Sequence, residues 1–261
     1  ARAGCLPRPL WLRTFGALAM PRVSVVLTSS HPGEYLRETI DAVLDQTFGD
    51  LDLTICGDGP EDVSKSVASG RRDPRIKAWG GNGACRDALS AGSAVSETAA
   101  GDYIATLRSG DLWALDKLER DVAYLDGHPD LGAVVTRAQP KNDQRLESAR
   151  PCCEPPDSWR WASLRQLFRG QRPDREFGIV VRRQSLRDAG PYRSGLARIG
   201  DVDLLSRLLI RCPVQVLEGG LVLAGVPAGA GGDRGCELEA EIQESNEWNL
   251  LRENYLSISS L

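Results

Sequence analysis

The chain lacks the features of a membrane-spanning or zinc-binding protein. None of its segments approaches the roughly 20 uninterrupted apolar residues that a transmembrane helix requires. Its seven cysteines are scattered without a Cys-x-x-Cys pair, and its two histidines lie near no acidic or cysteine cluster with zinc spacing. The odd cysteine count indicates reduced thiols and a cytoplasmic protein, with the adjacent Cys152 and Cys153 in a loop and not in a redox pair.

Lysine is also scarce, and acidic residues outnumber basic ones, 36 to 32. Lysine occurs only at positions 65, 77, 117 and 141, and the net charge is -4. This charge gives no electrostatic attraction to nucleic acid or to an anionic membrane, so neither is predicted as a partner. The predominance of arginine is interpreted as a bias of a GC-rich coding sequence and not as a phosphate-binding signal.

The first 20 residues differ in character from the rest of the chain. Basic and then apolar residues resemble a secretory signal, but Pro7, Pro9 and Arg13 interrupt the apolar run. Met20 comes directly before the first convincing strand. We therefore expect residues 1–20 to be an upstream extension outside the folded domain.

From residue 22 onwards, apolar runs alternate with segments of helical spacing. Strands are predicted at 22–27, 51–56, 75–79, 103–107, 132–136, 177–182 and 214–217. Helices are predicted at 34–46, 61–69, 85–100, 114–125, 158–168, 201–210 and 237–252. Such alternation favours a mostly parallel sheet built from right-handed β-α-β units. The predicted fold class is α/β: a Rossmann-like three-layer sandwich with helices on both faces of the sheet and a C-terminal helical extension.

Two segments are predicted to be irregular. Residues 138–157 are rich in proline, arginine and charge, which is typical of a long surface loop. Residues 219–235 contain seven glycines in seventeen positions, so we expect them to be mobile.

The segment 101–113 is the most informative about function. It reads Gly-Asp-Tyr-Ile-Ala-Thr-Leu-Arg-Ser-Gly-Asp-Leu-Trp, a buried strand that runs directly into a short polar turn. In an open α/β sheet, ligands bind in the crevice at the carboxyl ends of the strands. The turn at 108–111 is therefore a candidate ligand site.

Six segments carry a family resemblance in the right order. They are Val-Ser-Val-Val-Leu-Thr-Ser-Ser-His-Pro-Gly at 23–33 with Leu-Asp-Gln-Thr-Phe at 44–48, Cys-Gly-Asp-Gly at 56–59, Ala-Cys-Arg-Asp at 84–87, the segment 101–113, Ile-Val-Val-Arg-Arg-Gln-Ser-Leu at 179–186, and Gly-Asp-Val-Asp-Leu at 200–204. Together they resemble the family 2 inverting glycosyltransferases of the GT-A fold. The resemblance spans residues 22 to about 225.

This resemblance implies a domain organisation and an activity. The GT-A domain would occupy residues 21–235, with a nucleotide-sugar half at about 21–136 and an acceptor half at about 137–235, followed by a C-terminal helix at 236–261. The activity would be transfer of a sugar from a nucleoside-diphosphate sugar to an acceptor hydroxyl, with inversion at the anomeric carbon.

The resemblance also implies a donor site. Thr28, Ser30 and His31 in the first turn, with Asp58 in the second, would flank the nucleotide, and Asp58 would accept a hydrogen bond from the base or ribose. Arg86 would face the diphosphate. Each has a plainer alternative: Asp58 as an ordinary turn residue before glycine, His31 as a polar loop residue, and Arg86 as a surface arginine with a buried stem.

The metal motif of the family is altered here. The family usually shows Leu-Asp-Ala-Asp-Asp-Leu-Trp, whereas this chain has Arg108 and Gly110 at two acidic positions and keeps only Asp111. Asp111 with two phosphate oxygens could still hold Mg²⁺ or Mn²⁺, because magnesium keeps several waters. We expect weakened metal dependence, with Arg108 contacting phosphate bidentately and Ser109 also binding the donor. The alternative is a divergent copy that no longer turns over.

Asp201, at the start of a predicted helix, corresponds in the resemblance to the general base. It would take the proton from the acceptor hydroxyl as that hydroxyl attacks C1. Asp is also a common helix N-cap, and the two roles are compatible. The Glu that precedes this Asp in the family is Gly200 here, and Asp203 is expected to face the interior or a neighbouring arginine.

Several functional alternatives stay open at this point. The acceptor is a small molecule, such as a natural-product aglycone, or a glycan, with lipid-linked acceptors also open, and a homodimer is compatible with the sequence. The rival function is a catalytically inactive GT-A-fold protein that serves as a binding or partner subunit, which the missing acidic residues support. A nucleotidyltransferase is a weaker alternative, because no glycine-rich strand-to-helix phosphate loop is found near the N-terminus.

Overall fold

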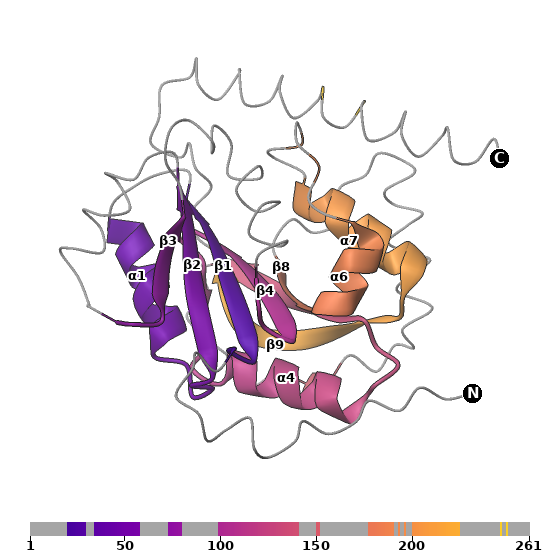
Figure 1. Cartoon of the computed structure of the whole chain (residues 1–261), viewed down its shortest axis with the longest axis horizontal. Coiled ribbons are helices and arrows are strands. Elements are labelled where there is room, and N and C mark those ends of the chain that lie inside the picture. Colours follow the sequence, from indigo (N-terminus) through magenta and orange to yellow (C-terminus); the bar gives the residue numbers. More distant parts are fainter. Residues whose placement is uncertain are drawn as a thin grey trace.

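The computed structural model describes residues 20–29, 34–57, 73–79, 99–140, 150–151, 177–190 and 200–224, with the single residues 193, 196, 246 and 249. The described strands form one mixed sheet between layers of helices (Figure 1). The strands are β1 Val23–Ser29, β2 Leu51–Gly57, β3 Ile76–Trp79, β4 Tyr103–Arg108, β5 Leu112–Trp113, β6 Ala133–Pro140, β7 Arg150–Pro151, β8 Phe177–Arg182 and β9 Val214–Ala224.

The sheet is parallel over most of its width. Its order is β3-β2-β1-β4-β8-β6-β9-β5, and β7 pairs with β9 outside this path. Strands β3, β2, β1 and β4 are parallel neighbours, and β6 is parallel to β9. Strand β8 runs antiparallel between β4 and β6. The predicted α/β class with a mostly parallel sheet is confirmed.

Helices cover both faces of the sheet. They are α1 Glu34–Leu44, α4 Lys117–Gly127, α6 Arg183–Ala189 and α7 Gly200–Arg211. The core under α1 and α4 includes Val25 and Leu27 of β1, whereas Val26 of the same strand belongs to the core under α6 and α7. Successive strand side chains point to opposite faces, so a strand covered on both sides needs a continuous apolar run.

Helix α1 packs on the sheet as its sequence predicts. Leu36, Ile40, Val43 and Leu44 are all buried at helical spacing. Each fully buried side chain of this size contributes about 1.5–3 kcal/mol relative to exposure. This packing fixes the position of α1 beside the turn that follows β4.

The segment after that turn differs from the prediction. The sequence predicts a helix over 114–125, but Leu112 and Trp113 form β5, and α4 begins only at Lys117. Strand β5 pairs antiparallel with β9, Leu112 opposite Leu223 and Trp113 opposite Val222. Because this partner lies far along the chain, no local pattern indicates the strand.

The two segments predicted as loops are partly strand. Residues 138–140 belong to β6 and residues 219–224 to β9, and the register shifts between Thr136 and Ala138. Glycines in a strand often mark such an irregularity. Strand β9 therefore extends far enough to reach β5, and the prediction of mobility for 219–224 is wrong.

Helix α6 was not predicted, and it follows β8 without an intervening loop. Of the C-terminal helix expected at 236–261, only Asn246 and Asn249 are described, and both have helical backbone. Residues 1–19 of the expected upstream extension lie outside the described residues, and so do the helices predicted at 61–69 and 158–168 and all but the last two residues of the one predicted at 85–100.

Candidate functional site at the carboxyl edge of the sheet

Strands β1 and β4 end together at one edge of the sheet. Thr28 of β1 lies opposite Arg108 of β4 in the parallel register. Thr28 Oγ1 donates to Leu107 O at 3.3 Å, and Ser109 N donates to Thr28 O at 2.9 Å. The structure therefore brings together three of the predicted donor-site residues, Thr28, Arg108 and Ser109.

The turn after β4 holds opposite charges close together. Asp111 N donates to Arg108 O at 3.1 Å, which closes the turn. Gly110 between them is buried and has φ 98°, a conformation that residues with a side chain rarely adopt. Arg108 is exposed and Asp111 is half-buried, so a cationic and an anionic group lie on the same turn.

Helix α7 begins at the same edge. Gly132 N donates to Pro213 O at 2.9 Å, and β9 starts beside Ala133 at the amino ends of the parallel strands. The end of α7 therefore lies at the amino edge. The helix has 12 residues and packs along the sheet, and at 1.5 Å per residue it is about as long as a six-residue strand. Its first turn, with the backbone of Asp201, lies toward the carboxyl edge.

Asp203, two residues further on, belongs to a buried cluster. Its carboxylate is fully buried and lies 2.7 Å from Arg207 Nη2 and 3.3 Å from Arg193 Nη1. Arg207 Nη1 also donates to Ala189 O and Gly190 O, both at 2.7 Å. Asp203 thus faces neighbouring arginines as predicted, and the cluster ties α7 to the end of α6.

The remaining donor-site predictions cannot be placed. Ser30, His31, Asp58 and Arg86 lie outside the described residues, and the side chain of Asp201 does too. Their roles therefore stay predictions.

Two polar side chains that the sequence analysis did not single out contact the β4–β5 region. Thr39 of α1 accepts from Gly110 N at 2.9 Å and donates to Asp111 O at 3.1 Å. Gln46 donates from Nε2 to Ala114 O at 2.7 Å and accepts from Leu118 N at 3.0 Å. The sequence signal that could have indicated Thr39 is its position as a polar residue on the apolar face of the helix, between Leu36 and Val43.

A buried ion pair lies beside this region, on the α4 face of the sheet. Lys117 Nζ is 2.6 Å from Asp121 Oδ2, with both side chains fully buried, a charge contact that lacks directed hydrogen-bond geometry. The ammonium also lies 4.5 Å from the ring centroid of Trp113. A Cβ atom on Gly178 of β8 would lie 3.3 Å from Lys117 Cε, so the absent side chain leaves room for the lysine. Burial raises the pKa of Asp121, and the charge of Lys117 opposes that rise.

The acidic side chains described at this edge could bind a metal ion only together with a bound phosphate-containing substrate. Among the described residues, no group of three or more His, Cys, Asp or Glu side chains could hold a metal ion. Asp111 supplies one carboxylate at the turn. Magnesium is commonly held by one or two carboxylates plus substrate phosphates, so the donor set fits a cation that a diphosphate helps to bind.

Comparison with known protein families identifies the family of the chain. The model of glycosyl transferase family 2 matches residues 24–190, more than half of the chain. The chain belongs to this family.

Curated relatives are similar to the chain over parts of their length. An uncharacterized glycosyltransferase of Rickettsia typhi is 27% identical over 49% of the chain and 39% of the relative. The putative glycosyltransferase EpsE of Bacillus subtilis is 28% identical over 72% of the chain and 66% of the relative. A UDP-Glc:alpha-D-GlcNAc-diphosphoundecaprenol beta-1,3-glucosyltransferase of Escherichia coli is 26% identical over 41% of the chain and 42% of the relative. The chain spans less than half the length of the first relatives it matches.

Solved glycosyltransferase structures share the fold. TarS 1-349 of S. aureus superposes with a TM-score of 0.60 at 15% identity, over 78% of this chain and 60% of that one. The mannosyltransferase PcManGT of Pyrobaculum calidifontis, in complex with GDP-Man and Mn²⁺, gives 0.54 at 16% identity, over 81% and 59%. The GT-A fold expected from the sequence is confirmed. No helix among the described residues is long and apolar enough to cross a membrane.

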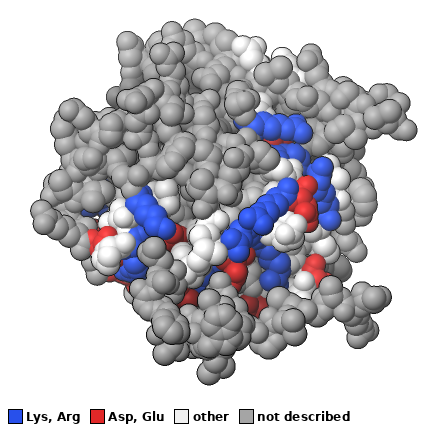
Figure 2. Space-filling model, viewed as in Figure 1, with Lys and Arg blue, Asp and Glu red and all other residues white. Residues whose placement is uncertain are grey.

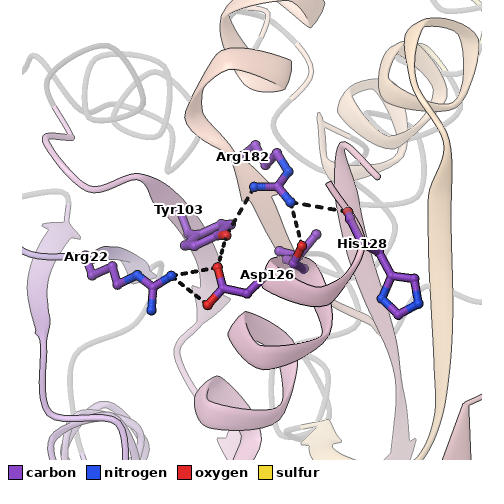
Figure 3. A network of polar contacts seen from close by, with 6 residues as sticks. Arg22, Tyr103, Asp126, His128 and Arg182 are labelled. Carbon is purple, nitrogen blue, oxygen red and sulfur yellow. Dashed lines mark hydrogen bonds and ion pairs between the residues drawn. The ribbon is translucent and has the colours of Figure 1, made fainter. Parts of the chain in front are cut away.

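The opposite edge of this GT-A sheet carries a polar network (Figure 3). Asp126 accepts from Tyr103 OH at 2.6 Å and from Arg22 Nη2 at 2.6 Å through both carboxylate oxygens. Arg182 donates to Tyr103 OH at 3.1 Å and to His128 O at 3.3 Å.

The network shifts the pKa values of two of its members. Burial, together with the hydrogen bond to Asp126, raises the pKa of Tyr103. Burial also opposes ionisation of Asp126, but the bonds from Tyr103 and Arg22 outweigh it and lower the pKa of this carboxyl. The network ties α4 to the amino ends of β1 and β4, away from the candidate site.

Surface charges are mixed in sign. On the face drawn in Figure 2, described basic side chains lie beside acidic ones. Exposed pairs such as Arg120–Asp116, at 2.6 Å, contribute about 0–1 kcal/mol each. The described part of that face therefore offers a polyanion no continuous positive surface.

Proposed function

We propose that the chain is a glycosyltransferase that moves a sugar from a nucleoside-diphosphate sugar to an acceptor hydroxyl with inversion. The observation that supports this most is that the turn after β4, the end of β1 and the first turn of α7 share one edge of the sheet. Family membership supports the reaction class. The nucleotide sugars in the names of the relatives and structural neighbours, UDP-Glc, UDP-GlcNAc and GDP-Man, support the donor class.

In this proposal the turn at 108–111 binds the diphosphate. The Arg108 guanidinium contacts the phosphate oxygens bidentately, a geometry that suits a planar donor fork. Thr28 and Ser109 contribute hydroxyl groups, and Asp111 helps to hold Mg²⁺ or Mn²⁺ when one is bound. Such a cation would stabilise the charge that develops on the leaving diphosphate. Ser30, His31, Asp58 and Arg86 complete the donor site by family resemblance.

The chemistry needs one base on the acceptor side. The acceptor oxygen forms a bond to C1 of the sugar while the bond from C1 to the diphosphate oxygen breaks, and the nucleoside diphosphate leaves with the electron pair. The Asp201 carboxylate takes the acceptor proton. A single displacement from the face opposite the nucleotide inverts the anomeric carbon. The acceptor is a small-molecule or glycan hydroxyl.

A donor panel tests the function. The purified chain is incubated with UDP-, GDP- and dTDP-sugars and a panel of aglycone, glycan and lipid-diphosphate-linked acceptors, and nucleoside diphosphate release is measured. We expect acceptor-dependent release with one donor, and a product of inverted anomeric configuration by NMR. Binding of a nucleotide without any release would instead support the inactive partner subunit.

Asp201→Asn separates catalysis from binding. We expect it to abolish transfer, because the amide cannot accept the proton, while the donor Kd changes less than about twofold. Asp188→Asn on α6, whose carboxylate bonds only to Gln184 among the contacts described, is the matched control and should keep full turnover. Substantial transfer by Asp201→Asn would exclude the base role.

Arg108→Gln tests whether Arg108 neutralises the negative charge of the donor phosphates. UDP binding is measured by calorimetry in the presence of Mn²⁺ and, separately, in the presence of EDTA. We expect the unaltered chain to bind UDP in both conditions, and Arg108→Gln to bind it about tenfold or more weakly. Arg120→Gln, a half-exposed arginine on α4, is the control and should bind normally. Strict metal dependence of the unaltered chain would show that Arg108 does not replace the cation.

A further inference from the structure

Thr39 is an unusual residue for the buried face of α1. Its side chain is 0% exposed, and a hydroxyl there needs hydrogen-bond partners. Two described partners belong to the turn after β4: Gly110 N donates to Oγ1 at 2.9 Å, and Oγ1 donates to Asp111 O at 3.1 Å. One hydroxyl thus satisfies a donor and an acceptor on successive residues.

We propose that Thr39 is a positioning residue that sets the Arg108 guanidinium and the Asp111 carboxylate toward the donor diphosphate. This inference rests on the proposed function. The Thr39 hydroxyl fixes the N–H of Gly110, the residue before Asp111, and the carbonyl of Asp111. The direction of the Asp111 Cα–Cβ bond is thereby set relative to α1.

Other contacts described for this region hold the two ends of the turn. Ser109 N donates to Thr28 O at the first end, and β5 pairs with β9 at the second. The bond from Asp111 N to Arg108 O fixes the shape of the turn but does not tie it to α1. Among the hydrogen bonds described for the turn, those of Thr39 join its middle to the helical layer.

The conformation of Gly110 makes this contact consequential. Its φ of 98° places it outside the regions that most residues favour, and its N–H is buried. Without the hydroxyl, that N–H and the Asp111 carbonyl must find other partners, and the turn relaxes. A shift of about 1 Å in groups that orient a substrate can cost roughly a hundredfold in rate. We expect about tenfold weaker nucleotide binding, since two charged contacts move together.

The test compares three variants by calorimetry with UDP and MnCl₂, and with UDP in EDTA. Thr39→Val keeps the shape of the side chain and removes the hydroxyl, whereas Thr39→Ser keeps the hydroxyl. Ser24→Ala is the matched control, because the buried Ser24 Oγ accepts from Gly101 N at 3.0 Å at the opposite edge of the sheet. Urea denaturation of each variant shows how far the whole domain is weakened.

The expected result is a UDP Kd raised about tenfold in Thr39→Val, restored to within about twofold in Thr39→Ser, and unchanged in Ser24→Ala. Unchanged binding by Thr39→Val, or equal weakening by Ser24→Ala, would overturn the positioning role. Thr39→Cys, with its weak thiol donor, replaces Thr39→Val if that variant does not fold. It should bind with intermediate affinity, and wild-type affinity would overturn the inference.

A separate outcome concerns the proposed function itself. If the unaltered chain binds none of UDP, GDP and dTDP under these conditions and transfers no sugar, the proposed function fails, and the positioning role fails with it. If the unaltered chain binds one of them and Thr39→Val binds it equally well, only the positioning role fails.

Discussion

Replacing Lys117 by methionine removes the cation from a fully buried pair and leaves the shape of the side chain almost unchanged. Asp121 then remains 0% exposed, with Thr136 Oγ1 at 3.4 Å as a weak partner. In the unaltered chain the two charges are 2.6 Å apart. At an effective dielectric constant of about 20, their attraction is roughly 6 kcal/mol, whereas desolvation costs several kcal/mol for each ion.

These magnitudes predict a large single-variant effect and a small double-variant effect. In Lys117→Met the cost of desolvating the Asp121 carboxylate remains, but the attraction between the two charges is lost. The free energy of unfolding should therefore fall by about 3–5 kcal/mol. That loss is a large share of the 5–15 kcal/mol that typically stabilises a domain. Lys117→Met with Asp121→Leu removes both costs and should lie within about 1–2 kcal/mol of the unaltered chain, or above it.

The effect of Lys117→Met should also depend on pH. Without the lysine, only the weak hydrogen bond from Thr136 opposes the rise that burial causes in the pKa of Asp121. The folded state then binds the proton more readily than the unfolded state, so stability falls as pH rises above the unfolded value near 4. The deficit of Lys117→Met should therefore be smaller at pH 5 than at pH 8.

Urea denaturation followed by tryptophan fluorescence measures these differences at both pH values. Trp113, beside Lys117, provides a local signal. A loss below about 1 kcal/mol in Lys117→Met would refute the buried-pair reasoning. So would a double variant whose loss equals the sum of the two single losses, because the charges would then be uncoupled.

Two further predictions concern other parts of the fold. Gly110→Ala should cost about 1–3 kcal/mol in urea denaturation, because an L side chain is strained at φ 98°, and it should also weaken UDP binding in calorimetry. Asp126→Asn should cost about 1 kcal/mol or less near pH 7, because the Arg22–Asp126 pair is partly exposed and screened. The pKa of Asp126 is lowered in the folded state, so this contribution is present above the unfolded pKa and is lost as pH falls through the folded pKa. The stability difference between the two chains should therefore vanish in strong acid, and a difference that persists there would contradict the assignment.

Much of the fold could be predicted because it depends on local apolar pattern. The central strands are buried on both faces, and their continuous runs stand out from the helical spacing of segments such as α1. The meeting of Thr28, Arg108 and Ser109 followed from the rule that parallel strands end at one edge. These features need no knowledge of distant partners.

The elements that were missed depend on distant contacts or lack start signals. Strand β5 exists because β9 pairs with it, and the glycines at 219–220 concealed that part of β9, since glycine disfavours strands. Helix α6 begins without a side-chain cap after Arg182, although Gly190, with φ 82°, marks its end. Lys117 and Asp121 have the spacing of a surface pair, and it is the packing of α4 against β5, β6 and β8 that makes them buried.

If the turn at 108–111 is an altered acidic motif, as the family resemblance implies, its contacts explain why the alteration need not change its shape. The hydrogen bonds described for it use the hydroxyls of Thr28 and Thr39 and backbone groups of Thr28, Leu107, Arg108, Ser109, Gly110 and Asp111. None of these bonds needs a carboxylate at position 108 or 110. Replacing acids by arginine and glycine there changes the charge offered to a diphosphate, while glycine suits the positive φ. A difference from the family pattern at this turn would therefore be one of charge, and measuring nucleotide affinity with and without a chelator tests it.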